Sequence, residues 1–222
     1  MSIFKAVVFD MDGVISHTNP YHDIAWRDFL KKYNIASSNQ EFEDHMYGKH
    51  NSYILNYFFK REIPIEERKQ LEFEKEALFR EIYADHITAI PGLVNFIENL
   101  HANGIKTGVA TSAPIENMQL ILPALGLDKI MGSMLAEGDV TKHKPEPEVY
   151  LKSAINLGVE PENCVVFEDS KSGVQAGINA GMKVVGVKTT YNELQLPPCN
   201  LYINDYTEIS FETVNSLFAV SL

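Results

Sequence analysis

Near its N-terminus the chain carries the sequence Phe4-Lys5-Ala6-Val7-Val8-Phe9-Asp10-Met11-Asp12-Gly13, an apolar run that ends in two aspartates. A short apolar run closed by a turn signal is typical of a buried strand, and Gly13 opens the turn. Residues two apart on a strand point to the same side, so both carboxylates face one way. The pattern predicts a buried strand that delivers Asp10 and Asp12 to its carboxyl end.

Three further apolar runs indicate strands, at residues 105–110, 164–167 and 183–187. Amphipathic helical spacing lies between them, at residues 93–100, 149–157 and 174–180. Strands that alternate with helices predict a parallel sheet covered on both faces. We therefore expect an α/β protein with a Rossmann-like parallel-sheet core.

Residues 20–86 interrupt this alternation, because they contain helical patterns and no strand signal. Asn19-Pro20 is a typical helix start, with Asn19 as N-cap and proline at the first helical position. The last helical stretch runs from about Ile65 to Tyr83. We expect a helical cap domain, residues 16–88, inserted after the first strand of an α/β catalytic core made of residues 1–15 and 89–222.

Composition excludes several classes of protein. The chain has 222 residues and a formal net charge of −11, a poor match for nucleic acid or an anionic membrane surface. No stretch approaches the roughly 20 apolar residues that span a bilayer, and no signal peptide is evident. Two cysteines cannot build a disulfide framework. A cytoplasmic location is expected; a monomer is compatible with the sequence, which does not reveal the oligomeric state.

Polar residues follow the other predicted strands as well. Thr111 and Ser112 follow the second run, Glu168 and Asp169 follow the third, and Lys144 precedes the helix at 149–157. Ligands of open α/β sheets gather at the carboxyl ends of the strands. Carboxylate oxygens suit Mg²⁺, and lysine and threonine suit a phosphate. Asp-x-Asp-Gly by itself fits an ordinary polar turn equally well; the convergence of all these groups predicts a Mg²⁺ and phosphate site.

Taken together and in order, four motifs resemble those of the haloacid dehalogenase superfamily, in the branch of β-phosphoglucomutase and small cap-bearing phosphatases. The motifs are Asp10-Met11-Asp12-Gly13-Val14, Thr111-Ser112, Lys144-Pro145 and Glu168-Asp169-Ser170. The resemblance spans nearly the whole chain, including the inserted cap. It is specific for the superfamily and much less so for the substrate.

The resemblance implies catalytic roles for Asp10 and Asp12. Asp10 is similar to the nucleophile that forms an aspartyl-phosphate, and Asp12 to the general acid and base. By the same resemblance, Thr111, Ser112 and Lys144 would bind the phosphate.

The resemblance also implies a Mg²⁺ cofactor. Its ligands would be Asp10, Asp169 and the backbone carbonyl of Asp12, with Glu168 as an additional ligand, direct or through water.

Four cap residues are candidates for substrate contact, also by resemblance. His22 resembles a cap-hinge histidine, Lys75 a substrate-facing lysine, and Lys49 and His50 lie in a loop that reads the leaving part of the substrate in relatives. The alternative for each is a structural or solvent-exposed role in the cap.

Three functions fit the motifs. The favoured one is a Mg²⁺-dependent phosphatase that acts on a small phosphorylated metabolite such as a sugar phosphate. A β-phosphoglucomutase is the alternative, but Asn51 stands where that enzyme has an arginine, whose planar fork suits a distal phosphate. A non-catalytic binding module is the third, and the four intact motifs argue against it.

Overall fold

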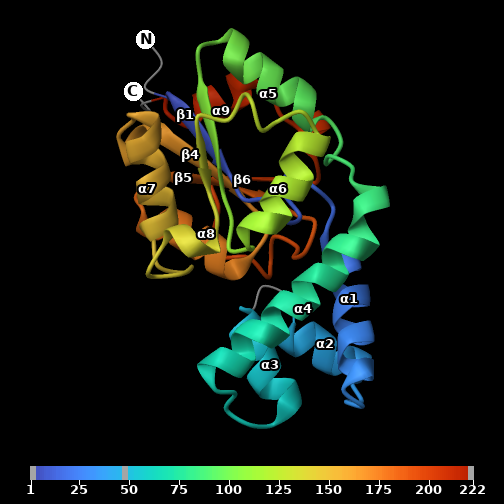
Figure 1. The fold of residues 1–222 in the computed structure, drawn as a ribbon. Helices are drawn as coiled ribbons and strands as arrows, with labels where there is room; N and C mark the ends of the chain where they lie inside the picture. Colours follow the sequence, from blue (N-terminus) through green and yellow to red (C-terminus); the bar gives the residue numbers. More distant parts are fainter. Residues whose placement is uncertain (1–3, 47–49, 220–222) are drawn as a thin grey trace. The chain divides into compact units, whose positions relative to one another are not determined.

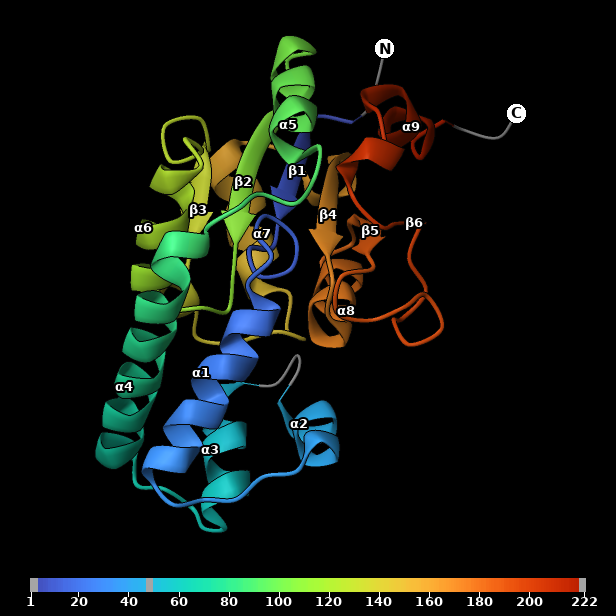
Figure 2. The same ribbon diagram turned by 90° about the vertical axis from the view of Figure 1, so that its right-hand side faces the viewer.

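The computed structural model describes residues 4–46 and 50–219, except for the side chain of Glu43. In this part of the chain one parallel sheet has the strand order β3-β2-β1-β4-β5-β6 (Figure 2). The strands are β1 Ala6–Phe9, β2 Lys106–Ala110, β3 Ser133–Leu135, β4 Cys164–Glu168, β5 Lys183–Val187 and β6 Leu201–Ile203. The expected α/β fold with a parallel sheet is confirmed.

Helices cover both faces of this sheet. Helices α7 (Glu148–Leu157) and α8 (Lys171–Asn179) lie on one face, while α5 (Leu93–Ala102) and α6 (Ile115–Ala124) lie on the other (Figure 1). Helix α9 (Phe211–Ser216) packs beside α5. Short 3₁₀ turns, η2 Glu137–Asp139, η3 Pro161–Asn163 and η4 Tyr206–Glu208, join these elements. This coverage explains why β1 and β4 are apolar without alternation: both faces of each strand are buried.

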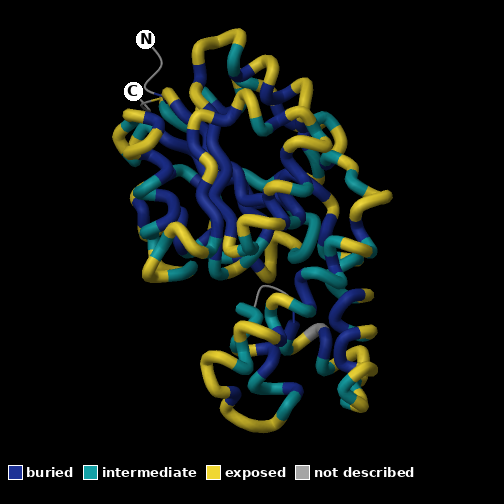
Figure 3. The backbone as a smooth tube through the Cα atoms, viewed as in Figure 1, coloured by how far each residue is buried: buried dark blue, intermediate teal, exposed yellow. Residues whose placement is uncertain are grey.

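A cluster of aromatic side chains packs against the central strands β1 and β4. Figure 3 shows the strands as the buried centre of this unit. The rings of Phe9, Phe96, Phe167 and Tyr206 pack together, with centroids 5.3–6.5 Å apart. Gly92, at φ +80°, starts α5 where a Cβ would lie 2.8 Å from the backbone of Thr207. Phe9 and Phe167 are also paired in the register of β1 and β4, and Asp10 directly follows Phe9.

The inserted segment is all helical in the described residues. Its helices are α1 Asn19–Lys32, α2 Asn39–His45, α3 Asn51–Phe59 and α4 Ile65–Tyr83, followed by the 3₁₀ turn η1 Ala84–His86. The helices bury a core of their own, which includes Trp26, Phe29, Phe42, Phe58 and Leu71. Helix α1 differs slightly from expectation, because Asn19 is its first residue and Thr18 occupies the N-cap position.

The chain forms two compact units, one of which runs to His17 and resumes at Thr88, while the other is Thr18–Ile87. Residues 16, 17 and 88, expected in the cap, therefore belong to the core unit. Backbone pairing explains this difference: Ser16 bridges Ala89, and the Ser16 hydroxyl donates to the carbonyl oxygen of Thr88 at 2.7 Å.

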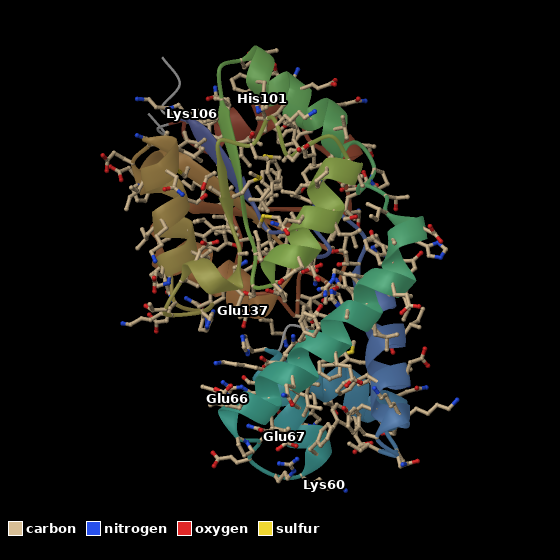
Figure 4. The ribbon with its side chains drawn as sticks, in the orientation of Figure 1. Lys60, Glu66, Glu67, His101, Lys106 and Glu137 are labelled. Atoms are coloured by element: carbon tan, nitrogen blue, oxygen red, sulfur yellow. The ribbon has the colours of Figure 1, made fainter. Side chains whose placement is uncertain are left out.

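The two ends of the sheet differ in chemistry. His101 and Lys106 lie at the amino end of β2, and Glu137, just after β3, lies at the opposite end of the core (Figure 4). At the amino end, Lys106 Nζ donates to the carbonyl oxygen of Leu157, the last residue of α7, which is a structural contact. The carboxyl end collects the polar residues described next.

Candidate active site

Asp10 and Lys144 form a buried ion pair at the carboxyl end of β1. Lys144 Nζ lies 2.6 Å from Asp10 Oδ1, 2.8 Å from Glu168 Oε1 and 3.1 Å from the carbonyl oxygen of Ala110. These three acceptors match the three protons of the ammonium group. These contacts hold Lys144 beside the Asp10 carboxylate.

Glu168 anchors this lysine. Its Oε1 accepts from Lys144 and from the Tyr150 hydroxyl at 3.0 Å, while Oε2 accepts from the backbone N–H groups of Asp169 and Ser170 and from the Ser170 hydroxyl. Five donors surround a carboxylate that has about four lone-pair sites, so its hydrogen-bonding capacity is fully used. Glu168, predicted as a metal ligand, thus has its oxygens engaged by protein donors in this structure.

Burial and charge shift the pKa values of this cluster. Burial raises the pKa of Asp10 well above 3.8; Lys144 opposes the shift, whereas Glu168, Asp169 and Asp12 add to it. For Lys144, burial lowers the pKa, but Asp10 and Glu168 outweigh burial and raise it well above 10.5. The ammonium therefore stays charged, and the carboxylates crowd around a single positive group.

Asp169 follows β4 and is held from the loop after β5. Its Oδ2 accepts from the hydroxyl of Thr190, and Thr189 Oγ1 lies 3.3 Å from the same oxygen. Thr189 Oγ1 also donates to the carbonyl oxygen of Gly13 at 2.6 Å, which ties this loop to the turn after β1.

The carboxylates fit a divalent cation. One oxygen from each of Asp10, Glu168 and Asp169 lies within 4.8 Å of the others, and all three residues are buried. Asp10 and Glu168 contact the lysine, and the charges of Asp169 and Asp12 act on Asp10, so acidic groups outnumber the one ammonium group and a cation would offset that excess. Hard oxygen donors of this kind suit Mg²⁺.

The remaining predicted core residues lie at the same edge of the sheet. Asp12 is half-buried in the turn after β1, where Gly13, at φ +72°, donates its N–H to the carbonyl oxygen of Ser16. Thr111 follows β2 and is buried; its hydroxyl oxygen accepts from the N–H of Ala113 at 3.0 Å, so its own proton points elsewhere. Ser112 beside it is exposed.

Two of the predicted cap residues contact each other. Lys75 Nζ, buried within α4, lies 2.8 Å from His22 Nδ1 and 2.8 Å from Glu76 Oε1. The His22 ring stacks on Phe79, with the centroids 3.7 Å apart. Because the lysine donates to Nδ1, the neutral imidazole carries its proton on Nε2.

His50, another predicted cap residue, makes different contacts. His50 is the N-cap of α3, and its Nδ1 contacts the hydroxyl and the N–H of Ser52. Lys49 lies outside the described residues.

Sequence reasoning missed three residues of the site: Tyr150, Thr189 and Thr190. The threonines follow the predicted strand at 183–187. The rule that polar residues after a strand lie at the site, which found Thr111 and Asp169, could therefore have found them too. Tyr150 gave no signal, because a tyrosine on the buried face of an amphipathic helix is indistinguishable from a core residue.

Comparison with known proteins agrees with the fold. A family model described as haloacid dehalogenase-like hydrolase matches residues 7–187. The chain is 32% identical over 194 residues to a phosphorylated carbohydrates phosphatase of Thermotoga maritima, covering 85% of this chain and 88% of that protein.

Two solved structures are similar over nearly their whole length. A family IA hydrolase from Entamoeba histolytica has a TM-score of 0.91 at 29% identity, covering 97% of this chain and 99% of that one. A β-phosphoglucomutase from Clostridium difficile has a TM-score of 0.85 at 29% identity, covering 97% of each chain.

These matches define the class of protein: the chain belongs to the haloacid dehalogenase-like hydrolases. Within that family it is an enzyme, a phosphohydrolase or a phosphomutase. In the part of the chain that the structure describes, no helix has the length and apolar character needed to cross a membrane.

Proposed function

We propose that this chain is a Mg²⁺-dependent phosphatase that removes phosphate from a small phosphorylated sugar through an aspartyl-phosphate on Asp10. The observation that carries the proposal is the ion pair between Lys144 and Asp10, buried at the carboxyl end of β1. A lysine so placed serves both the nucleophile and the phosphoryl oxygens. Similarity to a phosphatase of phosphorylated carbohydrates supports the substrate class.

The reaction has two steps. First, one Asp10 carboxylate oxygen attacks phosphorus, and the bond from phosphorus to the sugar oxygen breaks as Asp12 donates a proton to that oxygen. Then Asp12 accepts a proton from a water whose oxygen attacks the same phosphorus, and the bond to Asp10 breaks. Phosphate leaves, and Asp10 returns as a carboxylate.

Positioning comes from the surrounding residues. The positive charge of Lys144, held beside Asp10, attracts the phosphoryl oxygens, and the Thr111 hydroxyl and Ser112 would hold a further oxygen. Asp10, Asp169 and the carbonyl of Asp12 would hold Mg²⁺, with Glu168, which also anchors Lys144, as an additional ligand, direct or through water. The cation, when bound, neutralises the charge on the phosphoryl oxygens.

One contact in the cap favours a phosphatase over a mutase. Asn51, at the position of the mutase arginine, donates its side-chain N–H to Glu76 Oε1 at 2.9 Å. Glu76 also pairs with Lys75, so the amide and the lysine both serve a buried carboxylate. A mutase needs a firm anchor for the second phosphate of a bisphosphate, and these two groups are engaged inside the cap. His22, Lys49, His50 and Lys75 stay predictions for substrate contact.

Phosphate release from a panel of sugar phosphates, nucleotides and pyrophosphate tests the proposal. We expect release from a sugar phosphate that EDTA abolishes, and a loss of about 10³-fold or more for Asp10→Asn, which keeps the shape but removes the attacking oxygen. Asp85→Asn, an exposed carboxylate outside the site, is the matched control. Near-wild-type turnover by Asp10→Asn would contradict the mechanism.

A coupled assay separates the two candidate enzymes. Efficient conversion of β-glucose 1-phosphate to glucose 6-phosphate, with little free phosphate, would establish the mutase instead.

A further inference from the structure

The loop after β5 reaches the site from an element that none of the four motifs includes. Residues Thr189 and Thr190 directly follow Val187 and Lys188. Strands β4 and β5 are neighbours in the sheet, so this loop emerges beside Asp169 at the carboxyl end. Both hydroxyls approach the same atom, Asp169 Oδ2.

The two threonines have different primary acceptors. A hydroxyl has one proton, and that of Thr189 goes to the carbonyl oxygen of Gly13 at 2.6 Å rather than to Asp169 at 3.3 Å. Thr190 is therefore the principal hydroxyl donor from this loop to Asp169. Thr189 joins the same loop to the turn that carries Asp12.

We propose that Thr190 is a positioning residue for the metal: its hydroxyl sets the rotation of the Asp169 carboxylate and thereby the affinity for Mg²⁺. The inference rests on the proposed function, since it assumes that Asp169 is a ligand. A carboxylate already held in its binding orientation loses less rotational freedom when a cation arrives. Outer partners of metal ligands are worth about 10- to 100-fold in metal affinity.

The test compares Thr190→Val, which is isosteric but lacks the hydroxyl, with Thr190→Ser, which restores it. Thr141→Val is the matched control, because Thr141 donates to Glu148 Oε2 at 2.9 Å, a threonine–carboxylate bond outside the site. Mg²⁺ is titrated into each metal-free protein by calorimetry without substrate. The dependence of phosphate release on Mg²⁺ is measured in parallel.

We expect Thr190→Val to raise the Kd for Mg²⁺ about 10-fold or more. Thr190→Ser and Thr141→Val should stay within about 3-fold of wild type, and kcat at saturating Mg²⁺ should be largely recovered in all three. An unchanged Kd in Thr190→Val overturns the inference, as does a lost kcat that excess Mg²⁺ does not restore.

One further outcome separates the two proposals, and a second comparison is kept in reserve. If wild type itself binds no Mg²⁺, the proposed function fails together with this inference, whereas wild-type binding with an unaffected variant rejects the inference alone. If Thr190→Val does not fold by circular dichroism, Thr190→Ala against Thr190→Ser makes the same comparison.

Discussion

Gly173 in α8 leaves the space that the Glu168 carboxylate occupies: a Cβ at residue 173 would lie 1.5 Å from Glu168 Oε1. Only glycine lets the helix approach the strand end so closely. In this space, Glu168 Oε1 accepts hydrogen bonds from both Lys144 and Tyr150. A helix glycine thus controls the position of the lysine beside the nucleophile.

Replacing Gly173 by alanine should therefore disable the enzyme. The methyl group displaces Glu168, so Lys144 loses an acceptor, and we expect kcat for phosphate release to fall about 100-fold or more, as small misplacements of reacting groups do. Gly138→Ala is the control, since a Cβ there meets nothing within 4 Å. Steady-state kinetics and thermal unfolding check both variants; a Gly173→Ala enzyme with the kcat of the control would refute the role of Glu168.

Removal of the Tyr150 hydroxyl should lower kcat measurably, but less than removal of the Lys144 ammonium group. Tyr150→Phe keeps the ring 4.8 Å from Lys144 Nζ and removes one donor to Glu168. Losing a hydrogen bond to a charged group costs about 1.5–3 kcal/mol, so we expect kcat to fall by roughly 10- to 100-fold if the cost is felt in the transition state.

Tyr202→Phe is the matched control for this prediction, because its hydroxyl bonds the carbonyl oxygen of Pro197 away from the site. It should lose stability to urea without losing kcat. Equal kcat in Tyr150→Phe and Tyr202→Phe would show that the Tyr150 hydroxyl supports only the fold.

The effect of Asp12→Ala should depend on the leaving group. A general acid contributes about 10²–10⁴-fold when an alkoxide must leave, and much less when p-nitrophenolate leaves. We therefore expect a larger loss with a sugar phosphate than with p-nitrophenyl phosphate in the step that phosphorylates Asp10. Single-turnover measurements isolate that step from hydrolysis of the aspartyl-phosphate, which also needs Asp12. Equal losses on both substrates would argue against Asp12 as the acid.

The contribution of Asp10 to the stability of the metal-free protein should fall as the pH rises. Burial and neighbouring carboxylates raise the pKa of Asp10 above its ordinary value of 3.8, so the folded chain holds a proton that the unfolded chain releases. In the range from pH 3.8 to the raised pKa, Asp10 binds more protons in the folded state, and its contribution to the free energy of unfolding decreases with pH by at most about 1.4 kcal/mol per unit.

Urea unfolding in EDTA between about pH 4 and pH 8 measures this slope. Asp10→Asn has no such proton, so its slope of unfolding free energy against pH should be more positive than that of wild type by the contribution of Asp10. Mg²⁺ binds the ionised carboxylate and should stabilise wild type more at higher pH. Identical slopes for wild type and Asp10→Asn would contradict the pKa shift. Lys144 does not interfere, because its pKa is raised above 10.5, outside this range.

Local patterns in the sequence were sufficient for much of the fold. The runs at β4 and β5 are continuously apolar because both faces of a central parallel strand are buried, and such runs stand out without any knowledge of partners. Helix α4 was predicted at Ile65–Tyr83, the span the structure shows. Asp10, Asp12, Thr111 and Asp169 were found because they directly follow strands, and parallel strands bring their carboxyl ends to one edge.

Only the tertiary structure decided the rest. Strands β3 and β6 have three residues each, too few for a run that stands out in the sequence, and they form by pairing with β2 and β5 at the edges of the sheet. Lys144 is 134 residues from Asp10, and nothing local specifies that Glu168 is engaged by the lysine and Tyr150 while Thr190 holds Asp169. Local residue patterns predict which side chains are buried. The pairing of donors with acceptors depends on how segments distant in the sequence pack together in the folded chain.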